Sequence, residues 1–160
     1  MAARRPLSFW HPASLIATWF GSGLLPAIPG TWGSLAALPF AVVIVRAGGS
    51  WALLAAALAA FLIGLWAGAR YADSIGQPDP GKVVIDEVAG MWLALLPAVH
   101  HLPAYAIAFL FFRIFDILKI WPANVVQARL KGGLGIMADD IVAGLYAGAL
   151  TWATLAVMEL

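Results

Sequence analysis

The sequence alternates between long apolar blocks and short polar connections, a pattern typical of a chain that crosses a membrane several times. A helix needs roughly 20 apolar residues to cross a hydrocarbon core about 30 Å thick, and Trp51–Ala69 meets this requirement. Four further blocks predict shorter or less regular spans: Leu35–Val45, Val88–Val99, Tyr105–Trp121 and Ile141–Met158. The predicted fold is an all-α, polytopic membrane bundle of about four to five transmembrane helices with a Gly/Pro-rich N-terminal loop.

The charges in the connections predict how this bundle is oriented. If the N-terminus is cytoplasmic, the inner connections receive most basic side chains, namely Arg4, Arg5, Arg70, Lys82, Lys119, Arg129 and Lys131. The outer connections receive only Arg46. Because Lys and Arg concentrate on the cytoplasmic side of membrane proteins, we expect the N-terminus and the acidic clusters described below to face the cytoplasm.

Composition narrows the class of protein further. The 160 residues are 63% hydrophobic and 11% charged, which favours one membrane-embedded domain over residues 1–160. A net charge of +1, without a basic stripe, argues against a nucleic-acid partner. The lack of cysteine excludes a disulfide framework, a thiolate metal site and a cysteine nucleophile. The first 14 residues predict an interfacial lead-in, and no feature of the sequence indicates an oligomeric state.

The fourth predicted span contains three charged side chains, Arg113, Asp116 and Lys119, spaced by three residues along one helical face. With Trp121 at the interface, Arg113 would lie about 12 Å into the membrane core. A charge at that depth costs roughly 2.5 to 3.5 kcal/mol, so these side chains should face the bundle interior or a wet cavity. An ion pair that holds helices together is the alternative interpretation.

Two pairs of adjacent acids stand next to apolar blocks: Asp86 with Glu87, and Asp139 with Asp140. One acid at a helix N-terminus is explained as a cap, because it accepts hydrogen bonds from free N–H groups. A second acid about 4 Å away adds repulsion of something like 4 kcal/mol at an effective dielectric near 20, so a cation is expected beside it. Oxygen ligands without His or Cys favour Mg²⁺, and all four acids are predicted ligands.

The two acidic segments also resemble each other. IDEVAGMW, beginning at Ile85, aligns without gaps on DDIVAGLY, beginning at Asp139, so that Asp86 matches Asp140. Gly90, Gly144 and Gly148 would let the helices approach closely, and we expect a matched pair of helices that flank the metal.

The N-terminal segment GSGLLPAIPGTWGS, residues 21–34, combines flexible glycines with the hydroxyls of Thr31 and Ser34 just before an apolar block. Backbone N–H groups and hydroxyls at a helix start predict a phosphate seat. The segment matches neither the P-loop nor the dinucleotide fingerprint.

Together with DPGKVVIDEVAGMW, FRIFDILKIWP and GGLGIMADDIVAG, this segment makes the chain resemble the phosphatidylglycerophosphatase A family over about residues 20–150. The resemblance implies a bacterial inner-membrane enzyme of phospholipid biosynthesis that hydrolyses phosphatidylglycerophosphate to phosphatidylglycerol and phosphate with Mg²⁺. Carried over by motif, the implied catalytic residues are Asp86, Glu87, Asp116, Asp139 and Asp140. Arg113, Lys119, Thr31, Ser34 and Lys82 would contact the substrate phosphate. Attack by water and an aspartyl-phosphate intermediate both remain open.

Other classes of membrane protein are less consistent with the pattern. A small transporter or channel with an intramembrane acidic cation site would need polar residues along both halves of a path. Here the outer connections have only Arg46, His100 and His101 as ionisable residues. The motif of four spaced aspartates typical of phosphatidyltransferases is absent, as is the motif of lipid phosphatases with a histidine nucleophile.

Overall fold

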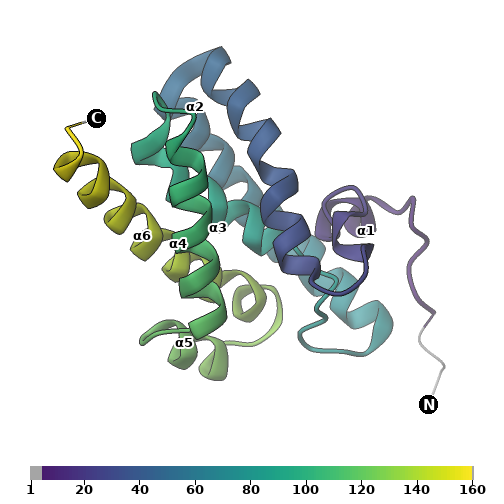
Figure 1. Cartoon of the computed structure of the whole chain (residues 1–160). Coiled ribbons are helices and arrows are strands. Elements are labelled where there is room, and N and C mark those ends of the chain that lie inside the picture. The colour runs from purple at the N-terminus through teal and green to yellow at the C-terminus, as the bar shows by residue number, and fades with distance from the viewer. Residues whose placement is uncertain (1–4, 160) are drawn as a thin grey trace.

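The computed structural model describes residues 5–159, apart from the side chain of Gln127, and these residues form helices and loops without a strand. Arg4, which the orientation argument includes, lies outside the described residues. The helices are α1 (Pro12–Ala17), η1 (Ser22–Leu24), α2 (Pro29–Ile75), α3 (Ile85–Leu95), η2 (Leu96–Ala98), α4 (Ala104–Leu118), α5 (Ala123–Arg129) and α6 (Gly132–Val157). Figure 1 shows the longer helices gathered into one bundle. The all-α prediction is confirmed.

The first two predicted spans lie within α2, a single helical element of 47 residues. The backbone of Gly48 (φ −158°, ψ 18°) and Gly49 (φ 66°, ψ −156°) interrupts the helix between them. The chain reverses direction there, so that α2 consists of two legs (Figure 1). A positive φ is accessible to glycine at little cost, which explains why the reversal falls on this pair.

The lead-in folds as part of the bundle. Its helix α1 begins at Pro12 after His11, whose Nδ1 accepts a hydrogen bond from the N–H of Ala13 over 3.1 Å. Ala17 is fully buried, and its carbonyl accepts a hydrogen bond from the N–H of Val84 over 2.8 Å. The predicted lead-in, residues 1–14, therefore ends inside α1, where Ala13 and Ser14 are buried against the bundle. Its interfacial position stays a prediction.

Helix α3 lies at the centre of the bundle, and nine of its residues are buried. It packs against both α2 and α6. A Cβ on Gly33 of α2 would lie 2.6 Å from that of Val84, the residue just before α3. With 11 residues, α3 extends about 16 Å. Alone it is too short to cross a bilayer, but η2 continues it to Ala98, so the predicted block Val88–Val99 falls on α3 and η2.

The remaining boundaries differ from the predicted ones at two places. Helix α4 ends at Leu118, and Lys119 follows it in the left-handed conformation (φ 44°), so the predicted continuation to Trp121 is wrong. Helix α6 begins at Gly132, nine residues before the predicted start at Ile141. The first difference places Lys119 just beyond the end of α4, and the second places Asp139 and Asp140 inside α6.

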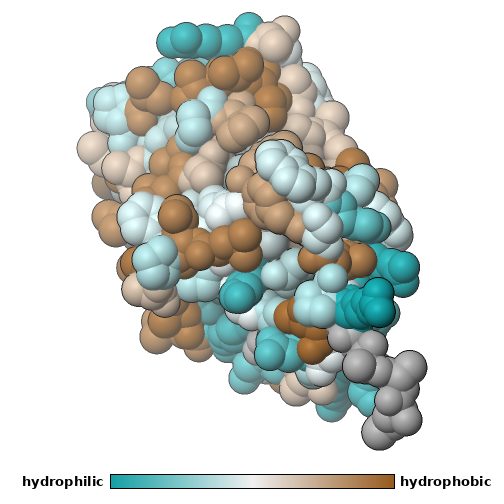
Figure 2. All heavy atoms as spheres, turned by 90° about the vertical axis from the view of Figure 1, so that its right-hand side faces the viewer, coloured by the Kyte–Doolittle hydropathy of each residue, from teal (hydrophilic) through white to brown (hydrophobic). Residues whose placement is uncertain are grey.

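Two helices, α2 and α6, are long and apolar enough to cross a membrane. Large apolar side chains remain exposed on both, including Trp51, Leu62, Trp66, Trp152 and Val157. On the face shown in Figure 2, hydrophobic residues cover much of the upper part, and hydrophilic residues are more frequent lower down. This surface is consistent with association with a membrane, since soluble monomers rarely expose such extensive apolar area.

Candidate active site

The five predicted catalytic acids lie around one cavity of about 160 Å³. They come from three helices: α3 contributes Asp86 and Glu87, α4 contributes Asp116, and α6 contributes Asp139 and Asp140. The other lining residues are Asp79, Pro80, Gly81, Val83, Lys119 and Ile136. We call this space the acidic cavity. Residues separated by more than 50 positions in the sequence thus share one small volume.

The first turn of α3 places two acids at the cavity. Asp86 is buried, and its Oδ1 accepts a hydrogen bond from the N–H of Glu87 over 3.1 Å. One carboxylate oxygen each from Asp86, Glu87 and Asp140 lie within 4.8 Å of one another. Oε2 of Glu87 is buried without a hydrogen-bond partner. The N-cap residue Val84 makes no side-chain cap hydrogen bond, so the capping interpretation is met only by the bond from the N–H of Glu87 to Asp86 in the first turn. Oε2 of Glu87 remains available for a ligand.

The acids on α6 are not at a helix start, which corrects the prediction from the sequence. Asp139 and Asp140 follow the first residue of α6 by seven and eight positions, about two turns inside the helix. Both are buried. A capping role is therefore excluded for this pair, and their burial needs another explanation.

Close packing between α3 and α6 brings the acids of both helices together. A Cβ on Gly90 would lie 2.5 Å from the carbonyl oxygen of Asp140, and a Cβ on Gly144 would overlap the carbonyl of Gly90. Gly148 meets Leu93 further along. The contacts progress in the same order on both helices, so α3 and α6 run in the same direction. The two aligned segments are thus in contact at their equivalent glycines, one turn from Asp86 and Asp140.

Two cations compensate part of the negative charge. Nη1 of Arg113 forms an ion pair with Oδ2 of Asp116 at 2.6 Å, and Nζ of Lys119 forms one with Oδ2 of Asp139. The left-handed backbone at Lys119 ends α4 beside the cavity. The alternative of an ion pair that holds helices together is therefore met by Lys119 and Asp139, which join the end of α4 to α6, whereas Arg113 and Asp116 pair within α4.

The Gly/Pro segment contacts Arg113 and Glu87 from outside the cavity lining. Nη1 of Arg113 donates a hydrogen bond to Oγ of Ser34 over 3.3 Å, and that hydroxyl donates to the carbonyl of Gly30 over 2.8 Å. A Cβ on Gly30 would lie 2.2 Å from Oε1 of Glu87, so a larger residue here would push the Glu87 carboxylate aside. Ser34 thus holds the guanidinium, and Gly30 closes the space over Glu87.

Of the five predicted phosphate contacts, Lys119 lines the acidic cavity, whereas Arg113, Ser34, Thr31 and Lys82 do not. Thr31 is partly buried in the first turn of α2, and Lys82 is exposed on the loop before α3. Neither belongs to the lining, although Gly81 and Val83 on either side of Lys82 do. Gly81 and Lys82 are both exposed, whereas residues 83–86 are buried, so Lys82 lies on the outer surface of the loop. Asp79, the first residue of the DPGKVVIDEVAGMW segment, also lines the cavity, although it was not among the predicted site residues.

The residues present fit a divalent cation. The acidic cavity is lined by the five predicted catalytic carboxylates, by Asp79 and by one cationic side chain, Lys119, while Arg113 pairs with Asp116 from outside the lining, which leaves an excess of negative charge. Mg²⁺ prefers one or two carboxylates together with water and phosphate oxygens. Asp86, Glu87 and Asp140 offer such oxygens close together. Asp139 as a further ligand remains a prediction, since the contact it makes is with Lys119.

Comparison with known proteins places the chain in a family. The sequence profile of phosphatidylglycerophosphatase A matches residues 15–155. The chain belongs to the phosphatidylglycerophosphatase A family. Membership makes it an enzyme of the lipid phosphatase kind, and the matched residues include every element that lines the acidic cavity.

Relatives in this family are similar over nearly their whole length. The phosphatidylglycerophosphatase A of Escherichia coli is 37% identical over 152 residues, which are 94% of this chain and 87% of the relative. That of Haemophilus influenzae is 36% identical over 151 residues, 93% of this chain and 92% of the relative. A Bacteroides thetaiotaomicron protein provisionally named phosphatidylinositol-3-phosphatase is 39% identical over 146 residues, 82% and 86% of the two chains. No solved structure matches the chain.

Proposed function

We propose that this enzyme hydrolyses the terminal phosphate of phosphatidylglycerophosphate with Mg²⁺, and so forms phosphatidylglycerol and inorganic phosphate in phospholipid biosynthesis. The observation that carries the proposal is the acidic cavity, where carboxylates from three helices meet two cationic side chains. The names of the family and of two relatives supply the lipid. The names of all three relatives describe phosphatases that act on phosphate esters of lipid headgroups. The acidic cavity suits the hydrolysis of such an ester.

In the proposed mechanism, Asp86, Glu87 and Asp140 hold Mg²⁺, with Asp139 as a further predicted ligand. The ion, when bound, supplies charge neutralisation at the phosphoryl oxygens and a more acidic water. Arg113 and Lys119 bind the phosphate oxygens and stabilise the charge that develops on them. To do so they exchange part of their pairing with Asp116 and Asp139 for contacts with the substrate.

Two groups are candidates for the nucleophile that attacks the phosphorus atom. A water molecule could attack in line while a neighbouring carboxylate accepts its proton. Alternatively, a carboxylate could attack and form an aspartyl-phosphate that water then hydrolyses. We assign either role to Asp116, which lines the cavity outside the group of three clustered ligand oxygens and is paired with Arg113.

We further propose a multi-pass arrangement in the bacterial inner membrane. The five segments are the two legs of α2, α3 with η2, α4, and α6. The acidic cavity then lies at the cytoplasmic side, where Arg70, Lys82, Arg129 and Lys131 also lie, in line with the concentration of basic residues on that side. The acyl chains of the substrate would stay in the surrounding lipid while the headgroup enters the cavity.

A transporter or channel remains the alternative class, and the distribution of buried charge argues against it. Among the Asp, Glu, Lys, Arg and His side chains of the described residues, those that are buried are Asp86, Asp139 and Asp140. All three line the same cavity. A transport path would need further polar steps along the bundle.

Phosphate release tests the proposed function directly. Purified protein in detergent is incubated with phosphatidylglycerophosphate, and free phosphate is measured with Mg²⁺ and after addition of EDTA. We expect Mg²⁺-dependent release that falls by about tenfold or more on chelation, as for other sites that depend on metal ligands, and that returns when excess Mg²⁺ is added. Release that is unaffected by EDTA would contradict the metal assignment, and no release under any condition would contradict the proposed activity.

A further inference from the structure

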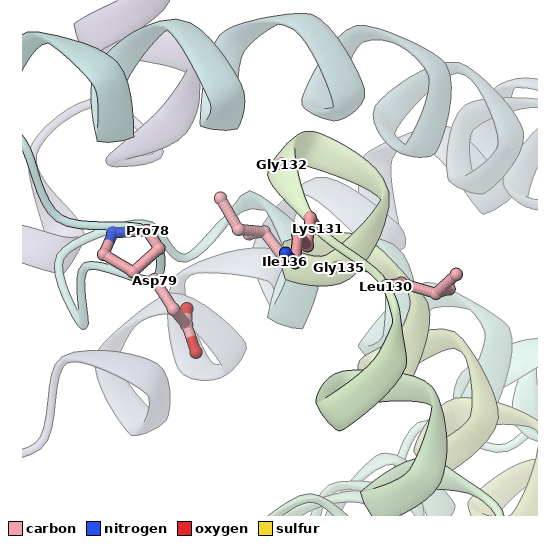
Figure 3. Close-up of a pocket in the computed structure, with 7 residues that line it drawn as sticks. All are labelled: Pro78, Asp79, Leu130, Lys131, Gly132, Gly135 and Ile136. Atoms are coloured by element: carbon pink, nitrogen blue, oxygen red, sulfur yellow. The ribbon is translucent and has the colours of Figure 1, made fainter.

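A second cavity, of about 450 Å³, lies next to the acidic cavity. Its lining residues are Pro78, Asp79, Leu130, Lys131, Gly132, Gly135 and Ile136. Figure 3 shows Pro78 and Asp79 on the loop after α2, across an opening from the residues at the start of α6. Asp79 and Ile136 line both spaces. The two cavities are therefore neighbours that share one wall.

The lining of the second cavity combines one cationic group with short and apolar surfaces. Lys131 is the residue just before α6, and Gly132 follows it with φ 63°. A Cβ on Gly132 would meet no atom within 4 Å, so its lack of a side chain leaves open space. Pro78, Leu130 and Ile136 supply apolar contacts. Such a lining suits an anion attached to a short aliphatic chain.

We propose that the second cavity binds the glycerol and phosphodiester of the lipid headgroup while the terminal phosphate occupies the acidic cavity. This inference rests on the proposed function. The substrate has two phosphates joined by a glycerol, and the structure has two adjacent spaces, each with a cationic side chain in its wall. Lys131 is the residue that binds the diester phosphate, as an ammonium pairs with a phosphate oxygen.

The shared wall gives this arrangement its selectivity. A ligand that occupies both cavities must pass Asp79 and Ile136. The part of the headgroup that connects the two phosphates is a three-carbon glycerol unit with one free hydroxyl. The carboxylate of Asp79 is an acceptor for that hydroxyl, and Ile136 contacts the carbon chain. A lipid whose phosphate monoester is attached directly to diacylglycerol lacks the second anion and would not use Lys131.

The same anion chemistry could come from a second source, the inorganic phosphate that leaves after hydrolysis. Two inhibitors distinguish these sources. Glycerophosphoglycerol, the deacylated diester without a terminal phosphate, should compete through the second cavity. Inorganic phosphate should compete through the acidic cavity.

The test compares Lys131→Gln with wild-type enzyme, using Lys131→Arg as the conservative variant and Arg129→Gln as the matched control. Arg129 is an exposed cation two residues away that does not line the cavity. We expect Lys131→Gln to raise the KM for phosphatidylglycerophosphate and the inhibition constant of glycerophosphoglycerol about tenfold, which is the effect of one lost charged hydrogen bond. The kcat and inhibition by inorganic phosphate should change less than about twofold, and Lys131→Arg should resemble wild type.

An unchanged inhibition constant for glycerophosphoglycerol in Lys131→Gln would overturn the inference. So would weaker inhibition by inorganic phosphate alone, which would assign the second cavity to the released product. Calorimetric binding of glycerophosphoglycerol to the purified protein needs no turnover, so it separates this inference from the proposed activity. If Lys131→Gln is unstable, Lys131→Met removes the same charge from this exposed position and is measured in its place.

Discussion

Replacing Asp140 by Asn is expected to lower the rate of phosphate release by at least about 100-fold. Asp140 is buried on α6, and one of its oxygens lies within 4.8 Å of ligand oxygens from Asp86 and Glu87. Removing a single group that stabilises charge in an active site typically costs about 10² to 10³ in kcat. Steady-state phosphate release with saturating Mg²⁺ measures the effect, and the Mg²⁺ concentration for half-maximal rate should also rise.

The stability of the same variant provides a second readout. Asp140 is buried among other acids around the cavity, so its carboxylate loses its hydration and is repelled by the like charges beside it. Asn removes that repulsion without changing the size of the side chain. In EDTA, the thermal midpoint of Asp140→Asn should therefore equal or exceed that of wild type. Asp73→Asn is the control, because this exposed acid at the end of α2 does not line the acidic cavity.

A comparison with Asp139, the neighbouring acid, shows which of the two residues acts as a metal ligand. Asp139 contacts Lys119, whereas Asp140 belongs to the group of three clustered oxygens. If both acids are metal ligands, Asp139→Asn and Asp140→Asn should raise the Mg²⁺ requirement to a similar extent. If Asp139 acts through Lys119, its variant should instead raise the KM for the lipid. Full activity in both variants would refute the site.

The apolar pattern was enough to predict the helical class but not the lengths of individual helices. Trp51–Ala69 was recognised because it is long and uninterrupted, and it lies inside α2. The start of α6 was missed because GGLGIMA contains three glycines, which have low helix propensity. In the structure, a Cβ on Gly133 would overlap the carbonyl of Leu65, so tertiary packing demands glycine there. Local propensity contains no information about such a contact.

The acidic residues of the site could be predicted from the sequence, whereas its cationic residues could be predicted less well. Asp86, Glu87, Asp116, Asp139 and Asp140 were identified because adjacent or intramembrane acids are costly without a partner. The chemistry of single residues sufficed for that step. Lys82 and Lys131, by contrast, are both basic residues next to glycines, and the sequence does not show which one faces a cavity. Only the fold of the loops distinguishes them, and Lys131 is the one that lines a cavity.

Gly144→Ala is expected to disrupt the site without altering any acid. The new Cβ would overlap the carbonyl of Gly90, where α3 and α6 are in closest contact. Overpacking of this kind costs about 1–3 kcal/mol of stability, because the two helices must separate. Asp86 and Asp140 lie one turn from the contact, so their carboxylates separate as well. A displacement near 1 Å can lower activity by about 100-fold, and we expect a loss of that order together with a lower thermal midpoint in detergent.

Gly68→Ala in α2 is the matched control for this substitution. There the nearest atoms to a new Cβ lie 3.6 Å away, an ordinary van der Waals contact. Because alanine is favoured over glycine inside a helix by roughly 0.5–1 kcal/mol, Gly68→Ala should unfold at the same or a higher temperature and should retain activity. The two variants add the same methyl group to a helix, so a difference between them reports the contact between α3 and α6. Equal activity and equal stability for Gly144→Ala and Gly68→Ala would mean that this close approach does not position the acids.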